Sequence, residues 1–238
     1  MSVAHLSTPL QKLLYSLSGL EGRLGSSARR KLRRRMAWPS MKNFLEHVAR
    51  LGTEDIVIDL GANMGIFTDI LAATGAEVHA YEPDPHCFEV LLRRFEGAEN
   101  VHLHNQAVSG EAGTFVLQRT KGFAESPDIK SQSSSIAITN ETIFDTENGI
   151  LVETVAFKDV VRNLGRPVAL VKMDIEGAEF SILDRILEDH SKGLALPIGR
   201  IFIETHERFM PERVIMVKEL RMANWTGALP YPIDTFWA

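Results

Sequence analysis

The sequence has few of the features that mark secreted or membrane proteins. It contains one cysteine, Cys87, among 238 residues, which excludes an intramolecular disulfide and a zinc site built from cysteines. No apolar run approaches the ~18–20 residues of a membrane-spanning helix. The N-terminus also lacks the apolar core of a signal peptide. These absences predict a cytoplasmic protein in a reducing compartment.

A third glycine is missing from the most glycine-rich turn. The stretch "VIDLGANMG" (57–65) has Gly61 and Gly65 four residues apart, whereas a loop that holds a dinucleotide pyrophosphate has the spacing G-x-G-x-x-G. Glycine permits a sharp turn and the close approach of a ligand. Asp59, at the end of the apolar run, can accept hydrogen bonds from a ligand ammonium group or from the loop itself. The turn alone is equally compatible with a strand-to-helix connection that binds nothing.

Charge is divided unevenly along the chain. Residues 1–37 carry eight Lys and Arg against one acid, a net charge of +7, and the remainder carries 18 basic and 30 acidic residues, a net charge of −12. The acidic body argues against general nucleic-acid binding. The basic stretch "RRKLRRR" (29–35) can contact phosphates, an anionic membrane surface or the acidic body, or form a solvated helix face.

The rest of the chain alternates between strand-like and helical patterns. Continuous apolar runs predict strands at 55–60, 76–82, 100–109, 168–174 and 200–206, with helices between them. This order predicts an α/β fold: a doubly wound, mostly parallel sheet with helices on both faces and a site at the carboxyl ends of its strands.

Two further features concern the borders of this domain. Gly22, Gly25 and Pro39 are expected to interrupt the N-terminal helices, which divides the chain into a basic helical extension (1–39) and a main domain (40–238). Residues 113–118 and 151–157 read as two extra strands that can pair. The polar segment between them includes "SQSSSI" (131–136), which can line an acceptor pocket with hydroxyls, form a lid over it or be a plain flexible loop.

Glu82, within "YEPDP", narrows the interpretation of the first turn. It ends the second predicted strand, 21 residues after Gly61, where an acid can accept both hydroxyls of a ribose. The prolines after it fix the backbone. Together with the first turn, this spacing predicts a bound adenosine-like group.

"DLGANMG", "YEPDPHCFEVL", "NQAVSG", "VKMDIEGAE" and "FIETHE", in this order, resemble the FkbM family of S-adenosylmethionine-dependent methyltransferases over about residues 50–207. The resemblance implies a Rossmann-like fold of the class I methyltransferase type in residues 40–238, S-adenosyl-L-methionine as cofactor, and O-methylation of a saccharide or natural-product hydroxyl. Carried over position by position, the cofactor-binding residues are Asp59, Gly61, Ala62, Asn63, Gly65, Glu82, Pro83, Gln106 and Ala107.

Methyl transfer to an alcohol needs positioning and a group that accepts the hydroxyl proton. Asp174, Glu204 and His206 are expected at adjacent strand ends, and the pKa of histidine makes His206 the natural base. Lys172 shares the predicted face of Asp174 and can be its ion-pair partner. These four residues are the expected catalytic set.

A divalent metal bound by Asp174, Glu204 and His206 is possible but not favoured, and no metal is predicted. Glu176 and Glu179 are expected in a first helical turn, where acids stabilise the helix dipole. His79, His102 and His104 alternate with apolar residues and are expected to be packed or solvent-facing rather than ligands.

Two other functions stay open. A nicotinamide-dependent oxidoreductase would need the pyrophosphate glycines that this sequence lacks. A non-catalytic nucleotide-binding or interaction protein would keep the pocket without turnover. The sequence does not identify the acceptor or the oligomeric state, and a homo-oligomer is compatible with it.

Overall fold

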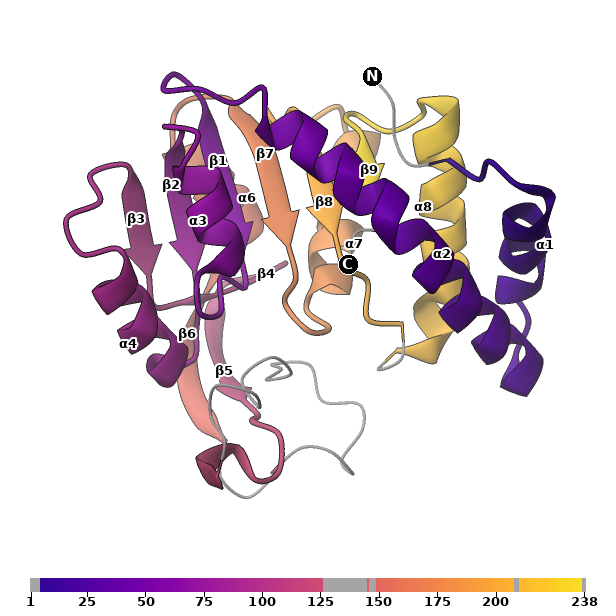
Figure 1. Ribbon diagram of the computed structural model, residues 1–238, viewed down its shortest axis with the longest axis horizontal. Helices are drawn as coiled ribbons and strands as arrows, with labels where there is room; N and C mark the ends of the chain where they lie inside the picture. Colours follow the sequence, from indigo (N-terminus) through magenta and orange to yellow (C-terminus); the bar gives the residue numbers. More distant parts are fainter. Residues whose placement is uncertain (1–4, 126–144, 146–148, 208–209, 237–238) are drawn as a thin grey trace.

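The computed structural model describes residues 5–125, 145, 149–207 and 210–236. Its centre is a six-stranded sheet in the order β3-β2-β1-β7-β8-β9 (Figure 1), in which every pairing is parallel. The strands are β1 (Ile56–Leu60), β2 (Glu77–Tyr81), β3 (Val101–His104), β7 (Val168–Met173), β8 (Ile201–Ile203) and β9 (Ile233–Asp234). The predicted doubly wound, mostly parallel α/β sheet is therefore confirmed.

Helices cover both faces of the sheet. The helices that follow the strands are α3 (Ile66–Ala72), α4 (Pro85–Arg94), α6 (Phe157–Asn163), α7 (Glu179–Ser191) and α8 (Val214–Thr226), the last preceded by a 3₁₀ turn, η3 (Pro211–Arg213). One apolar core joins α3 and the C-terminal part of the long N-terminal helix to one face. A larger core joins α6, α7 and α8 to the other face. The central strands β1, β7 and β8 are buried on both sides, as their uninterrupted apolar runs predict.

A second, three-stranded sheet lies beyond the carboxyl ends of the main strands (Figure 1). It has the order β4-β6-β5, with β4 (Ala107–Ser109), β5 (Gly113–Leu117) and β6 (Ile150–Ala156). The predicted pairing of the two extra strands is confirmed, and it is antiparallel. A 3₁₀ turn, η1 (Phe123–Glu125), follows β5, and "SQSSSI" lies outside the described residues.

The N-terminal extension consists of α1 (Pro9–Ser18) and α2 (Gly22–Val48). The expected helix breaks at Gly25 and Pro39 are wrong, because α2 runs through both positions. Gly25 lies where a Cβ would meet the Leu20 carbonyl oxygen at 1.7 Å, so this glycine permits the tight turn between α1 and α2. The proposed domain boundary at 39/40 therefore falls inside a helix.

Packing on both sides explains why α2 continues through Pro39. Met36 and Phe44, before and after the proline, are fully buried. Ser40 and Asn43 donate hydrogen bonds of 2.9 and 3.0 Å to the Asp234 carboxylate of β9. These tertiary contacts offset the backbone hydrogen bond that proline cannot make. Within the described part of the chain, no helix combines the length and the apolar character needed to cross a membrane.

Candidate active site

The order of the strands reverses between β1 and β7, which is where ligands bind in open parallel sheets. The loops that follow these two strands are in direct contact. Asp174 N–H donates to the Leu60 carbonyl (3.0 Å), and a Cβ built on Gly61 would lie 1.8 Å from the Asp174 carbonyl oxygen. Gly61 also has a φ of +73°. Packing of the two loops therefore requires glycine here before any ligand is considered.

Lys172 and Asp59 form a buried ion pair under this contact. The two side chains are 2% and 0% exposed, with 3.1 Å between Nζ and Oδ1. Lys172 also donates to the Gly61 carbonyl (2.6 Å), and Thr68 Oγ1 donates to the other Asp59 oxygen (2.7 Å). Burial alone would lower the pKa of Lys172, but the negative charges of Asp59 and Asp174 raise it above its ordinary value.

These contacts change the roles expected for Lys172 and Asp59. The sequence pointed to Asp174 as the ion-pair partner of Lys172, whereas the ion pair in the structure is with Asp59 on the neighbouring strand. Asp59 in turn accepts a hydrogen bond from Thr68 of α3 and pairs with Lys172, which donates to Gly61 of the first loop. Both residues thus hold the loop after β1 in place.

Glu82 follows β2 and is buried against the first loop. One of its carboxylate oxygens accepts a hydrogen bond from the backbone N–H of Asn63, and the other from that of Asp84, each at 2.8 Å. Burial raises the pKa of Glu82 to about 7 despite these two donors. Asn63, at φ +50°, directs its N–H toward Glu82.

The other predicted cofactor residues lie in the segments that follow β1, β2 and β3. The Asn105 amide donates to the carbonyls of Glu82 and Pro83, at 2.8 and 3.2 Å. Gln106 follows it, and Ala107 begins β4. Gly65, at φ +87°, caps α3. Ala62 is buried in an apolar cluster with Ala80 of β2 and Leu91 of α4. The structure thus brings the nine predicted positions to one edge of the sheet.

Four carboxylates surround His206. Nδ1 lies 3.0 Å from Glu179 Oε1, and Nε2 lies 3.2 Å from Glu176, 3.6 Å from Glu204 and 3.8 Å from Asp174. Glu179 also accepts the backbone N–H groups of His206 and Gly177, both at 2.6 Å. The expected neighbours Asp174, Glu204 and His206 therefore lie together.

The protonation of this cluster favours a carboxylate as the base. Burial would lower the pKa of His206, but hydrogen bonds to Glu176 and Glu179 outweigh it and raise the pKa to about 10. An imidazolium at neutral pH cannot accept a proton, and His206 is only 1% exposed. Burial raises the pKa of Asp174 and of Glu204. Asp174 has the most accessible side chain of the cluster, at 29%.

The expected positions of Glu176 and Glu179 need one correction. Helix α7 begins at Glu179, so Glu176 precedes the helix and does not stabilise its dipole. Glu176 adopts a φ of +52°, which is uncommon for a residue with a side chain. This backbone conformation places its carboxylate beside His206. Sequence reasoning missed both glutamates as partners of His206, although both lie in "DIEGAE".

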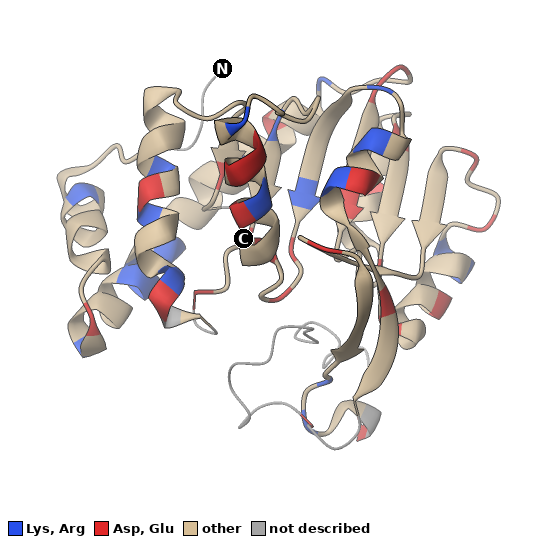
Figure 2. Ribbon diagram, turned by 180° about the vertical axis from the view of Figure 1, so that it is seen from behind, with Lys and Arg blue, Asp and Glu red and all other residues tan. Residues whose placement is uncertain are grey.

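Arg33 of α2 is a third residue that the sequence did not indicate. Its guanidinium lies 3.4 Å from the Glu204 carboxylate and donates to the Thr205 carbonyl at 2.5 Å. Positive charges lie along α2 and acids in the loops after the strands (Figure 2). One part of the basic extension thus contacts the acidic cluster directly.

Asp174, Glu204 and His206 also form a group that could hold a metal ion, since one ligand atom from each lies within 4.8 Å of the others. Two carboxylates and one imidazole suit a divalent cation only if His206 gives up its proton.

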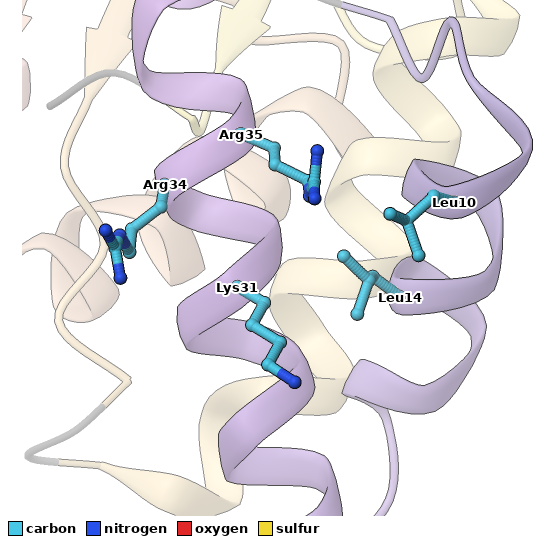
Figure 3. Close-up of a pocket in the computed structure, with 5 residues that line it drawn as sticks. All are labelled: Leu10, Leu14, Lys31, Arg34 and Arg35. Atoms are coloured by element: carbon cyan, nitrogen blue, oxygen red, sulfur yellow. The ribbon is translucent and has the colours of Figure 1, made fainter.

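A separate hollow of about 520 Å³ lies between α1 and α2. Leu10 and Leu14 project from α1, and Lys31, Arg34 and Arg35 from α2 (Figure 3). None of the predicted catalytic or cofactor-binding residues lines it. This hollow is therefore distinct from the edge where the strand-end loops meet.

Comparison with known proteins shows which family the chain belongs to. The profile of the Methyltransferase FkbM domain matches residues 59–223. The chain belongs to the FkbM methyltransferase family. The match includes both loops at the switch point and the acidic cluster around His206.

Individual methyltransferases are similar to parts of this chain. Methyltransferase sdnD of Sordaria araneosa is 28% identical over 174 residues, which cover 62% of this chain and 67% of that protein. The 31-O-demethyl-FK506 methyltransferase FkbM of Streptomyces tacrolimicus is 30% identical over 162 residues, 59% of this chain and 62% of that protein. The crystal structure of methyltransferase FkbM from Methylobacillus flagellatus KT is similar over 79% of this chain and 46% of that one, with 17% identity and a TM-score of 0.40.

Proposed function

We propose that this FkbM-family methyltransferase transfers a methyl group from S-adenosyl-L-methionine to a hydroxyl of a saccharide or natural-product acceptor. The observation that carries the proposal is the meeting of the Glu82 loop, the β1 loop and the Asp174–His206 cluster at one edge of the sheet. The name of the Streptomyces relative, a 31-O-demethyl-FK506 methyltransferase, supports an oxygen acceptor.

The residues around Glu82 fit the cofactor. A carboxylate held by two backbone N–H groups keeps further acceptor positions, which suit the paired hydroxyls of a ribose. The β1 loop, Gly61 to Gly65, would hold the amino-acid part, and Gln106 and Ala107 would lie beside the adenine. When bound, S-adenosyl-L-methionine supplies an electrophilic methyl group and leaves as S-adenosyl-L-homocysteine.

Asp174 would act as the base in this reaction. As the acceptor oxygen forms its bond to the methyl carbon, the hydroxyl proton passes to the Asp174 carboxylate. Burial raises the pKa of Asp174 and makes its carboxylate a stronger proton acceptor. His206 and Lys172 keep their positive charges near Asp174 and hold it in place, and Glu204 approaches the same His206 nitrogen, Nε2, as Asp174 does.

Two variants separate the binding role from the catalytic role. Glu82→Ala should weaken binding of S-adenosyl-L-homocysteine in calorimetry, because the ribose loses its acceptor. Asp174→Asn should keep that affinity and lower incorporation of radiolabelled methyl groups across a panel of hydroxylated glycosides and macrolides. Binding of NAD in place of S-adenosyl-L-homocysteine would overturn the proposal, as would an Asp174→Asn enzyme with the parental rate.

We further propose that the outer side of α1 and α2 contacts an anionic lipid surface. Leu13 and Leu24 are 56% and 59% exposed there, and Trp38 is 73% exposed. Leu24 and Trp38 lie on α2 together with the exposed Lys31, Arg34 and Arg35, and Leu13 lies on α1, which packs against α2. Apolar and aromatic side chains interleaved with cations are typical of helices that bind the headgroup region of an anionic bilayer.

A further inference from the structure

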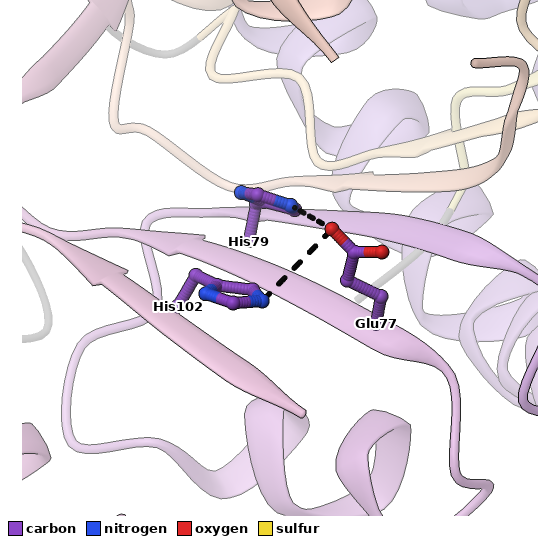
Figure 4. A group of neighbouring side chains, drawn as sticks. All are labelled: Glu77, His79 and His102. Carbon is purple, nitrogen blue, oxygen red and sulfur yellow. Dashed lines mark hydrogen bonds and ion pairs between the residues drawn. The ribbon is translucent and has the colours of Figure 1, made fainter. Parts of the chain in front are cut away.

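A group of metal-ligand side chains lies on β2 and β3, away from the candidate active site. The parallel register pairs His79 with His102 and Tyr81 with His104, and Glu77 precedes them on the same face of β2. Figure 4 shows the Glu77 carboxylate facing the two imidazoles. Glu77 is the first residue of β2, whereas Glu82 follows its last. The length of the strand, about 3.3 Å per residue, therefore separates this group from the proposed cofactor site.

The ligand atoms converge on one carboxylate oxygen. Oε1 of Glu77 lies 3.0 Å from His79 Nε2 and 3.9 Å from His102 Nε2. One ligand atom from each of the three residues lies within 4.8 Å of the others. Two ligands of a tetrahedral zinc ion with bonds of about 2.0–2.2 Å are about 3.4 Å apart. These two separations bracket that value, and the ligand atoms of His79 and His102 lie within 4.8 Å of each other.

Neighbouring groups hold these ligands as a metal site requires. Arg166 binds the other Glu77 oxygen, Oε2, at 3.0 Å, which leaves Oε1 directed at the imidazoles. Nδ1 of His79 lies 3.2 Å from His104 Nε2, so the far side of the His79 ring has a hydrogen-bonding partner. Such contacts fix the orientation and tautomer of a ligating histidine.

We propose that Glu77, His79 and His102 bind a zinc ion that joins β2 to β3. Two imidazoles and a carboxylate form a donor set typical of zinc. Glu77 and His102 are 33% and 47% exposed, so solvent can reach the ion and complete its coordination. The site is structural, because it lies at the opposite end of β2 from Glu82.

Calorimetric titration of the EDTA-treated full-length protein with Zn²⁺ at pH 7.5 tests the site. The parent should bind zinc, and His102→Ala should lower the affinity of this site at least tenfold. His102 is about half exposed, so its removal leaves the fold intact. His190→Ala removes a histidine of α7 that contacts the Ala228 carbonyl and serves as the matched control. Failure of the parent to bind zinc, or equal affinity in His102→Ala and parent, would overturn the proposal.

Two further measurements separate this site from the acidic cluster around His206. Zinc should raise the melting temperature of the parent and of Asp174→Asn, and it should raise that of Glu77→Gln less. Anomalous diffraction at the zinc edge should place the ion beside Glu77. An anomalous peak only beside Asp174 and His206 would contradict the proposal.

Discussion

The carbonyl oxygen of Asp174 occupies the space where a side chain on Gly61 would begin. A Cβ at Gly61 would lie 1.8 Å from that oxygen. The two residues follow β1 and β7, the strands on either side of the switch point. Gly61 and Asp174, the proposed base, are thus coupled through a backbone contact. A change at Gly61 would displace the residue that is proposed to accept the proton.

Gly61→Ala should therefore be far more damaging than an alanine at another left-handed glycine. Gly97 has a similar φ, +79° against +73°, but no atom lies within 4 Å of the position that a Cβ would take there. Gly97→Ala should cost about 1–2 kcal/mol, the strain of the left-handed conformation alone. Gly61→Ala adds a backbone clash and should lower the free energy of unfolding by more than about 3 kcal/mol. Urea denaturation measures the free energy of unfolding of the two variants. Equal losses of this free energy would show that the clash at Gly61 does not add to the strain.

The buried pair of Lys172 and Asp59 predicts strong coupling between two substitutions. Lys172→Met leaves the Asp59 charge buried without its counter-ion and should cost about 3–5 kcal/mol. Adding Asp59→Asn removes that charge and keeps an acceptor for Thr68, so the double variant should be more stable than Lys172→Met alone. A double-mutant cycle in urea measures the coupling. Additive losses would show that the two side chains do not stabilise each other.

Periodicity and topology explain how much of this arrangement the sequence could predict. Apolar runs identify the strands, and parallel order brings their carboxyl ends to one edge, so Asp174, Glu204 and His206 were expected together. The sequence also pairs the two strands of the second sheet correctly. In both cases the signal is local, and the rule that connects the segments is a property of the fold class.

Contacts that depend on tertiary packing leave no local pattern in the sequence. Arg33 and Thr205 are 172 positions apart, and one basic residue in "RRKLRRR" looks like the next. Proline usually ends a helix, but Ser40 and Asn43 anchor α2 to Asp234 beyond Pro39. The ion-pair partner of Lys172 lies on the neighbouring strand β1, which the spacing within "VKMD" does not indicate. Each miss is a long-range contact that outweighs a local preference.

Glu82 predicts a specific dependence of stability on pH. Its pKa rises from about 4.5 to about 7 on folding, because burial disfavours the charged form. The stabilisation from the protonated carboxyl is fully present below pH 4.5 and is lost as the pH rises through 7, up to about 3 kcal/mol. Glu82→Gln mimics the protonated form and should lack this slope. Unfolding of parent and variant at pH 5 and pH 8 measures it, and parallel curves would contradict the raised pKa.

The exposed face of α1 and α2 predicts binding to anionic vesicles. Reversing Arg34 and Arg35 to glutamate should lower partitioning onto phosphatidylserine-containing vesicles at least tenfold, since each cation contributes about 1 kcal/mol near such a surface. The matched control is a double variant, Arg93→Glu with Lys192→Glu. Both residues are exposed; Arg93 lies on α4 and Lys192 directly follows α7. Sedimentation with neutral and anionic vesicles gives the readout. Equal binding of both double variants, or binding to RNA without binding to vesicles, would contradict the lipid assignment.

Arg33 connects the same helix to the acidic cluster and predicts an effect on catalysis. Its charge lowers the pKa of Glu204 against the burial that raises it, so Arg33→Ala should raise that pKa further. The pair is partly exposed, and its loss should cost less than about 1 kcal/mol of stability. The methyl-transfer rate should fall roughly two- to tenfold, about 0.4–1.4 kcal/mol in the barrier, as the cluster rearranges around Asp174. Arg34 is the next residue on α2 and is exposed, so Arg34→Ala should keep the parental rate of methyl transfer. Equal rates in the two variants would show that α2 does not support the site.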